Sequence, residues 1–234
     1  MSGLADRTRL RIFAPLALLV AVIALVGFWP TYFGTLLSGA AAPPIIHLHA
    51  AVFVLWLGLF IGQAMLAATG RIGLHRRLGN WIMAYAVVLI TVALVTACIV
   101  FQERVAAGNF ADAARRLFAP VRDMVCFIPF LLAGWIYRHK AEMHKRLMLV
   151  ATTILLVASV SRMFFLGKPV PMLQLLLVWA SPIYLAMLWD WFTRRLVHPV
   201  YVVGIAVMAT MRLAIPLRDT TAWLTFCEWL ARTG

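Results

Sequence analysis

The chain has little negative charge, few charged residues of any kind and few cysteines. Only 12% of its 234 residues are charged, and Asp and Glu together number 8. A soluble globular domain carries about 25% charged and about 45–50% apolar residues, whereas 64% of this chain is hydrophobic. One globular core has no room for so much apolar surface, because a domain of this size still exposes about a quarter to a third of its unfolded area. The composition therefore predicts an integral membrane protein and excludes disulfide-rich, collagenous, disordered and cytosolic Rossmann-type proteins.

The cysteines and the placement of the basic residues exclude two further classes. Cys98, Cys126 and Cys227 form no CxxC motif, so no disulfide framework and no metal spacing is predicted. The formal net charge of +13 would favour a nucleic-acid partner in a soluble protein. Here the basic residues lie at the ends of apolar runs, and no basic stripe is interleaved with aromatic residues. We therefore expect a lipid bilayer, and no nucleic acid, as the partner.

Long hydrophobic runs are abundant, and seven of them are long enough to cross a membrane. About 20 apolar residues in a helix span roughly 30 Å of hydrocarbon. The predicted fold is an all-α integral membrane bundle of seven transmembrane helices that forms a single domain, residues 1–234. Two amphipathic stretches, 109–118 and 220–232, are predicted to be interfacial helices on the membrane surface. The spans are expected at about 12–29, 45–68, 80–101, 120–137, 147–166, 172–192 and 199–217.

The basic residues also set the predicted orientation. With the N-terminus in the cytoplasm, twelve of the 21 Lys and Arg lie in a short tail and three short loops on the cytoplasmic side. The positive-inside rule favours this N-in, C-out topology. The inner loops share a motif, with HRRL starting at His75, HKRL at His144 and TRRL at Thr193. This repeated motif predicts three related hairpins after one solitary helix. The alternative is that the positive-inside rule alone explains the arginines in these short inner loops.

Two histidines at the outer end of the second span are candidate metal ligands. His47 and His49 lie about 200° apart on a helix, so a regular helix does not aim both at one ion. A ligand or substrate role for at least one of them competes with the simpler possibility of a solvated histidine at a helix mouth. His49, Trp56 and Gln63 fall on one stripe, which predicts a polar face directed into the bundle.

Two arginines within the predicted spans need an explanation. Arg162 and Arg212 lie in the outer third of their spans, where a charge is costly and usually faces a cavity or a partner. Snorkelling to the headgroups is the structural alternative. Asp123 is a candidate partner for either arginine, and with His47, His49 and Gln174 these residues would converge in one outer pocket. Arg162 also lies 18 residues after His144, which predicts that both share one face of the fifth span.

The histidines on the inner side offer a different site. Haem b held between two histidines needs ligands from different helices at one depth. His75 with His144, or His198 with either, meets this condition. On the outer side both histidines come from one helix, so the pattern favours one haem over two. A quinone headgroup contacted by His and Arg, or a non-haem metal ion, stays open, although no HxxxH or HExxH motif is present.

Two stretches carry a resemblance to known proteins. The run HLHAAVFVLWLGLFIGQAMLAATGRIGLHRRLGNW, with its outer HxH and inner HR-x-LG motifs, resembles uncharacterised multi-pass bacterial inner-membrane proteins. The run HKRLMLVATTILLVASVSR is similar to a segment of small membrane proteins linked to respiratory oxidase assembly. Together they cover less than a third of the chain. The resemblance implies a bacterial cytoplasmic membrane protein near haem or respiratory chemistry.

Three functions are compatible with these observations. The leading hypothesis is a His-dependent redox or cofactor-binding role, with haem b, a quinone or a metal ion near His49, His75 or His144. The first alternative is a non-enzymatic accessory or assembly subunit whose nine Trp help it pack against other membrane proteins. The second is a small-molecule or anion carrier. The sequence does not decide whether the protein is an enzyme. The candidate cofactor-binding residues are His49, Gln63, His75, His144, Arg162 and Arg212.

Overall fold

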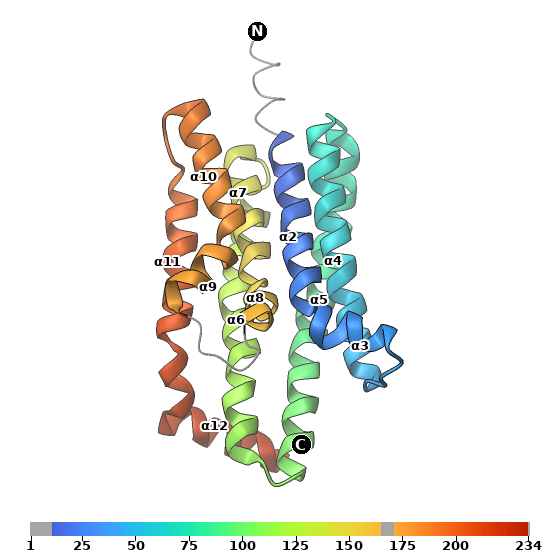
Figure 1. The fold of residues 1–234 in the computed structure, drawn as a ribbon. Coiled ribbons are helices and arrows are strands. Elements are labelled where there is room, and N and C mark those ends of the chain that lie inside the picture. The colour runs from blue at the N-terminus through green and yellow to red at the C-terminus, as the bar shows by residue number, and fades with distance from the viewer. Residues whose placement is uncertain (1–10, 165–170, 234) are drawn as a thin grey trace.

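The computed structural model describes residues 11–164 and 171–233, and every regular element in these ranges is helical (Figure 1). Among the described residues, the first helix, α2, continues through a π-helical turn into a short helix, and eight further α-helices precede the C-terminal one. The elements are α2 (Phe13–Phe28), η1 (Trp29–Phe33), α3 (Gly34–Leu37), α4 (Pro44–Ala68), α5 (Ile72–Ala106), α6 (Phe110–Ile136), α7 (Ala141–Ile154), α8 (Val157–Phe164), α9 (Met172–Trp179), α10 (Ser181–Arg194), α11 (Pro199–Leu213), η2 (Ile215–Asp219) and α12 (Thr221–Thr233).

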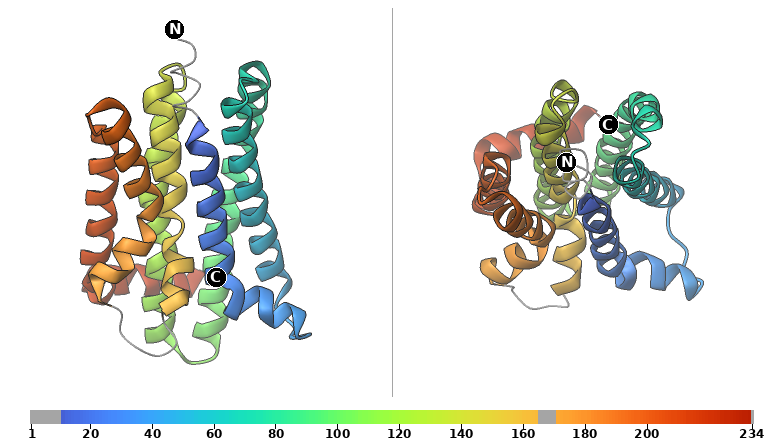
Figure 2. Two further views of the ribbon diagram at one scale, coloured as in Figure 1. Left: turned by 45° about the horizontal axis from the view of Figure 1, so that its top comes forward. Right: turned by 90° about the horizontal axis from the view of Figure 1, so that it is seen from above.

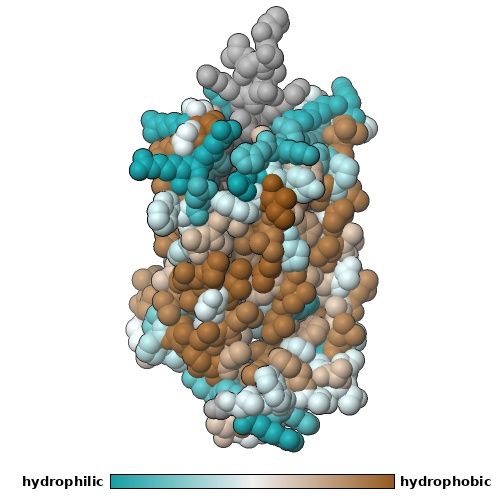
Figure 3. Space-filling view, turned by 180° about the vertical axis from the view of Figure 1, so that it is seen from behind, coloured by the Kyte–Doolittle hydropathy of each residue, from teal (hydrophilic) through white to brown (hydrophobic). Residues whose placement is uncertain are grey.

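The surface of the bundle has the distribution expected in a bilayer. An apolar band covers the middle of the face shown in Figure 3, between hydrophilic groups at its two ends. Large apolar side chains such as Trp81 and Val87 are exposed on the outside of the bundle. Five described helices are long and apolar enough to cross a membrane, and the number rises to seven if each of two bent helix pairs is one span. The prediction of an all-helical membrane protein is therefore confirmed, with five to seven candidate spans.

The two bent pairs depart from the straight spans predicted over 147–166 and 172–192. Helices α7 and α8 meet at 41°, and α9 and α10 meet at 64°. Pro182 in the first turn of α10 has no N–H to continue α9, which explains the second bend. The first bend has neither Gly nor Pro, but the Trp179 indole donates a hydrogen bond of 2.8 Å to the carbonyl of Thr153 there. Residues 165–166 of the predicted fifth span lie outside the described residues.

The stretch 109–118 does not form a separate interfacial helix, because it is the first part of α6. Its apolar side chains, Ala114 and Leu117 among them, are buried against Phe101 of α5 and Cys227 of α12. This packing carries the helix straight on through Pro120 into the predicted fourth span. At 1.5 Å per residue, α5 is about 52 Å long and α6 about 40 Å. Both helices therefore exceed the hydrocarbon thickness. The other amphipathic stretch, 220–232, does form a separate helix, α12.

The topology gives the bundle two distinct ends. The N-terminal end carries the start of α2 and the turns α4–α5, α6–α7 and α10–α11, and the C-terminal end carries α12 (Figure 1). Helix α4 packs along α5, and α6 packs along α7, whereas α10 and α11 touch at few points. Seen from above, α2 lies between α4 and α10 (Figure 2) and contacts both. Its Gly27 faces the backbone of Ser159 so closely that a Cβ would clash, so glycine permits this crossing of α2 and α8.

Candidate functional site

The structure brings His75 and His144 together at the N-terminal end of the bundle. His75 lies in the first turn of α5 and His144 in the first turn of α7. Their ring centroids are 6.0 Å apart, and the ring planes cross at 80°. Both side chains are half-buried. Two histidines from different hairpins thus lie side by side at this end of the bundle, and ligands from different helices at one depth are what two-histidine haem ligation requires.

The two histidines are held in the same way by their own hairpins. Nδ1 of His75 lies 3.2 Å from the carbonyl oxygen of Gln63 in α4, and Nδ1 of His144 lies 2.8 Å from that of Gly134 in α6. A carbonyl oxygen only accepts, so both Nδ1 atoms donate, and in the neutral imidazoles both Nε2 atoms carry a free lone pair. Metal-bound histidines usually donate their second nitrogen in this manner, which fixes the tautomer and the ring orientation.

Helix ends and a close helix contact explain the His144 bond. Gly134 lies two residues before the end of α6, where carbonyl groups lack a partner within the helix. A Cβ on Gly134 would stand 2.8 Å from Sδ of Met148, so the glycine allows α6 and α7 to approach closely. The shared HRRL and HKRL motifs therefore reflect two hairpins that each bring one histidine to the same place in the bundle.

The α4–α5 hairpin is loosely packed around this pair. In the part nearest the turn, residues 57–81, no side chain is fully buried. The facing hairpin buries Leu131, Gly134 and Leu147 at the same end. The described residues include no group of three or more His, Cys, Asp or Glu placed to hold a metal ion. The pair therefore supplies two nitrogen ligands and no third, a donor set that suits a haem, whose porphyrin provides the other four nitrogens, better than four-coordinate zinc.

The predicted polar stripe of α4 leads from His49 to this pair. Trp56 is 1% exposed and packs edge-on against Phe127 of α6. Three buried polar atoms on the stripe have no hydrogen-bond partner among the described residues: Nδ1 of His49, Nε1 of Trp56 and Oε1 of Gln63. Buried polar groups are nearly always satisfied. The stripe is therefore a place where waters or a ligand would complete the hydrogen bonding.

The two outer histidines contact different neighbours. Nδ1 of His47 lies 3.0 Å from the hydroxyl of Tyr32, and the ring of His49 stacks on Phe53 with centroids 4.5 Å apart. As the helical spacing predicts, they do not share a ligand direction. Arg162 is close enough to His49 to act electrostatically on its imidazole, so these two candidates do lie in one neighbourhood.

Arg162 and Arg212 have surroundings that the sequence does not reveal. The guanidinium of Arg162 donates to the carbonyl of Ala158 at 2.8 Å and lies 4.6 Å from the ring centre of Phe28. The bend between α7 and α8 interrupts the helical phase, so the expectation that His144 and Arg162 share one straight helix face is wrong. Arg122 lies within electrostatic reach of Arg212.

Asp123 pairs with its own neighbour and not with either predicted arginine. Its Oδ1 accepts from Nη2 of Arg122 at 2.7 Å, and Arg122 also donates to the carbonyl of Met211 at 3.1 Å. The prediction of an Asp123 pair with Arg162 or Arg212 is therefore wrong, because an adjacent arginine on the same helix reaches the carboxylate first. The contacts of the outer polar residues thus fall into two groups, one at α2–α4–α8 and one at α6–α11.

Sequence reasoning missed a buried ionic cluster at the N-terminal end. Arg146 is 0% exposed, and its Nε and Nη2 donate to Oδ2 of Asp190 at 2.9 and 2.6 Å. Its Nη1 donates to Glu142 at 2.6 Å, and Glu142 also binds Lys145 and Arg194. The cluster ties α7 to α10. Its only sequence signal is the basic loop, which the positive-inside rule already explains.

Comparison of the chain with protein-family models, with curated proteins and with solved structures finds no significant match.

Proposed function

We propose that this chain is a membrane-embedded b-type haem protein in which His75 and His144 are the axial ligands of one iron. The geometry of the pair is the observation that supports this most directly. A nitrogen–metal bond is about 2.0 Å, and the corners of an imidazole lie roughly 1.1 Å from its centre for ring bonds of about 1.35 Å. Two imidazoles on one iron therefore have centroids about 6.3 Å apart. The rings here are 6.0 Å apart.

The role that fits this ligand set is one-electron transfer. His75 and His144 would hold the haem from two hairpins, and a haem held by two histidines would supply reversible one-electron chemistry and no site for a substrate. The paired Nδ1 donors keep both imidazoles in place in either state. Because both histidines are half-buried near the bundle end, a haem held by them would lie within reach of a redox partner.

The orientation and location belong to the same proposal. We propose that the N-terminal end of the bundle, which carries the basic loops, is on the cytoplasmic side, as the positive-inside rule favours, and that the haem would lie near the cytoplasmic face. The resemblance of the HxH, HR-x-LG and HKRLM segments to bacterial proteins supports a bacterial inner membrane. Under this proposal the protein works beside other membrane proteins that supply or receive the electron.

The carrier alternative draws on the two bent spans. Transporters often break helices near the membrane midplane, where the freed backbone groups line a substrate cavity. Here the break between α7 and α8 is sealed by the Trp179 indole, which is 0% exposed and binds the carbonyl of Thr153. A sealed break gives a carrier less support than one that lines a cavity.

The proposal is tested by a reduced-minus-oxidised visible spectrum of the protein purified in mild detergent. We expect sharp haem bands at about one haem per chain, lost in both His75→Ala and His144→Ala. His139→Ala is the matched control, because His139 is exposed at the same end of the bundle, and it should keep the bands. A flat wild-type spectrum after expression with added haem precursor would overturn the proposal, as would full haem content in either axial-ligand variant.

A further inference from the structure

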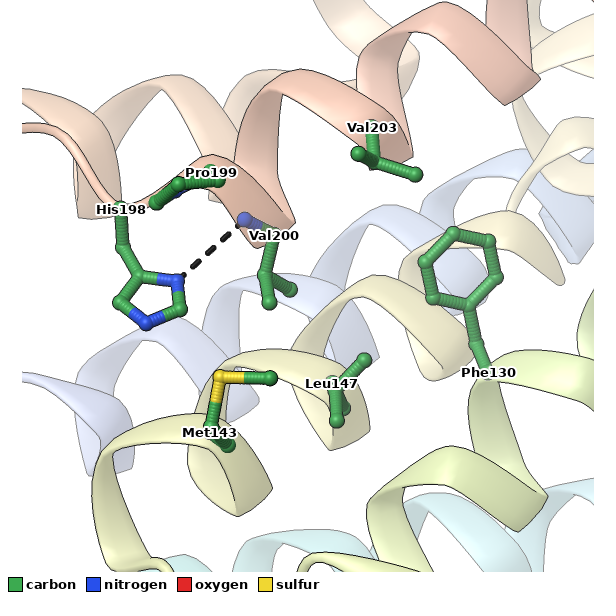
Figure 4. A pocket seen from close by; sticks show the side chains of 7 residues that line it. All are labelled: Phe130, Met143, Leu147, His198, Pro199, Val200 and Val203. Carbon is green, nitrogen blue, oxygen red and sulfur yellow. Dashed lines mark hydrogen bonds between the residues drawn. The ribbon is translucent and has the colours of Figure 1, made fainter.

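A further histidine at the N-terminal end, His198, lies at the edge of an apolar pocket. The pocket has a volume of about 440 Å³ and lies between α6, α7 and α11 (Figure 4). Phe130, Met143, Leu147 and Val203 line it, and His198 marks its end. Ligand pockets of small molecules range over about 300–1,000 Å³, so one ring-sized molecule fits here.

The hydrogen bonding of His198 fixes which of its nitrogens is free. The backbone N–H of Val200 donates to Nδ1 of His198 at 3.3 Å, so Nδ1 carries no proton. Burial, and next the nearby Arg146, lower the pKa of His198, which is therefore neutral at physiological pH. The proton of the neutral ring must then be on Nε2. No described residue accepts a hydrogen bond from Nε2, and in Figure 4 this nitrogen lies on the Met143 side of the ring.

The exposure of the lining residues shows where the pocket opens. Phe130, Leu147 and Val200 are buried and form its floor. Val203 is 53% exposed, and Pro199 is also exposed. Because α11 is one of the apolar candidate spans, this side of the pocket faces the bilayer. An occupant must therefore arrive through lipid, be largely apolar, and offer one hydrogen-bond acceptor at the edge of its ring.

We propose that this pocket binds the ring of a lipid-soluble quinone, one carbonyl oxygen of which accepts a hydrogen bond from Nε2–H of His198. A quinone meets each requirement, because its carbonyl oxygens are attached directly to a flat apolar ring and its tail remains in the hydrocarbon phase. The site is separate from the His75–His144 pair and does not need a haem to form. The inference therefore goes beyond the proposed haem function.

The test is photolabelling with a decyl benzoquinone that carries an azido group, using protein in phosphatidylcholine nanodiscs free of other quinones. We expect saturable labelling of peptides from α7 or α11. His198→Asn removes the Nε2 donor but keeps a good N-cap for α11, and it should raise the half-saturating concentration about three- to tenfold. Val203→Trp fills the pocket and should abolish labelling.

Two controls keep the outcome clear. Val202→Trp places the same bulk at a neighbouring residue that is 56% exposed and does not line the pocket, and it should label like the wild type. The His75→Ala/His144→Ala variant should also label normally, so failure of the haem proposal leaves this one standing. Equal labelling of the wild type, His198→Asn and Val203→Trp would overturn the inference, as would a co-purified phospholipid in the pocket that the quinone does not displace.

Discussion

Replacing Arg146 by methionine removes the most deeply buried cation of the ionic cluster that joins α7 to α10. Asp190, whose side chain is 4% exposed, then loses two hydrogen bonds of 2.9 and 2.6 Å. Its remaining cationic neighbour is Arg194, with Nε 3.9 Å from Oδ1. Removing one partner of a buried pair costs about 3–5 kcal/mol. Because Arg194 partly compensates, we expect a loss of about 3 kcal/mol in the free energy of unfolding, measured by SDS titration in mixed micelles.

The double variant Arg146→Met/Asp190→Leu separates this reasoning from a simple packing defect. Replacing both charges by apolar groups of similar size is often neutral or stabilising, so the double variant should recover most of the lost stability. Arg104→Met is the control, because Arg104 pairs with Asp112 on the exposed surface, and its transition should not move. A wild-type transition for Arg146→Met, or a double variant no more stable than the single one, would refute the account.

Two further predictions concern packing and reactivity. Gly27→Ala should destabilise the protein by about 1–3 kcal/mol, because a Cβ there meets backbone atoms of α8. Gly58→Ala is the control: a Cβ at Gly58 meets no other atom, so this variant should leave the unfolding transition unchanged or raise it slightly. Burial raises the pKa of Cys227 from 9.0 to about 11. Maleimide reacts with the thiolate, and a higher pKa leaves less thiolate at pH 8. In a variant in which Cys98 and Cys126 are replaced, maleimide should therefore label Cys227 about a hundredfold more slowly at pH 8 than it labels an exposed thiol of ordinary pKa.

The hydrophobic runs predicted the helical membrane fold but not the shape of each span. Run length and composition are local properties, and they locate α2, α4 and α11 well. The bend between α7 and α8 coincides instead with a tertiary contact, the hydrogen bond that Trp179 of another helix donates to the carbonyl of Thr153. The bend at Pro182 did have a local signal, the missing N–H of proline. The extension of α6 through 109–118 depends on contacts with α5 and α12, which no local pattern encodes.

In the candidate site, too, the features with a local sequence signal could be predicted, and those that depend on contacts between distant residues could not. His75 and His144 occupy equivalent positions in a repeated motif, so the sequence could place them at one end and on neighbouring hairpins. The Arg146–Asp190 pair joins residues 44 apart in the chain, and the sequence offers many other pairings for each charge. For Asp123 the sequence analysis expected a distant partner, Arg162 or Arg212, whereas its carboxylate pairs with the adjacent Arg122.

Electron paramagnetic resonance of the oxidised protein in mild detergent tests the haem proposal most directly. If His75 and His144 hold one ferric iron with their rings crossed at 80°, as the rings are in this structure, the protein should give a strongly anisotropic low-spin signal at about one spin per chain. His139→Ala should keep this signal, and His75→Ala or His144→Ala should lose it. A high-spin signal from iron with an open position, or protein that takes up no haem iron, would contradict the account.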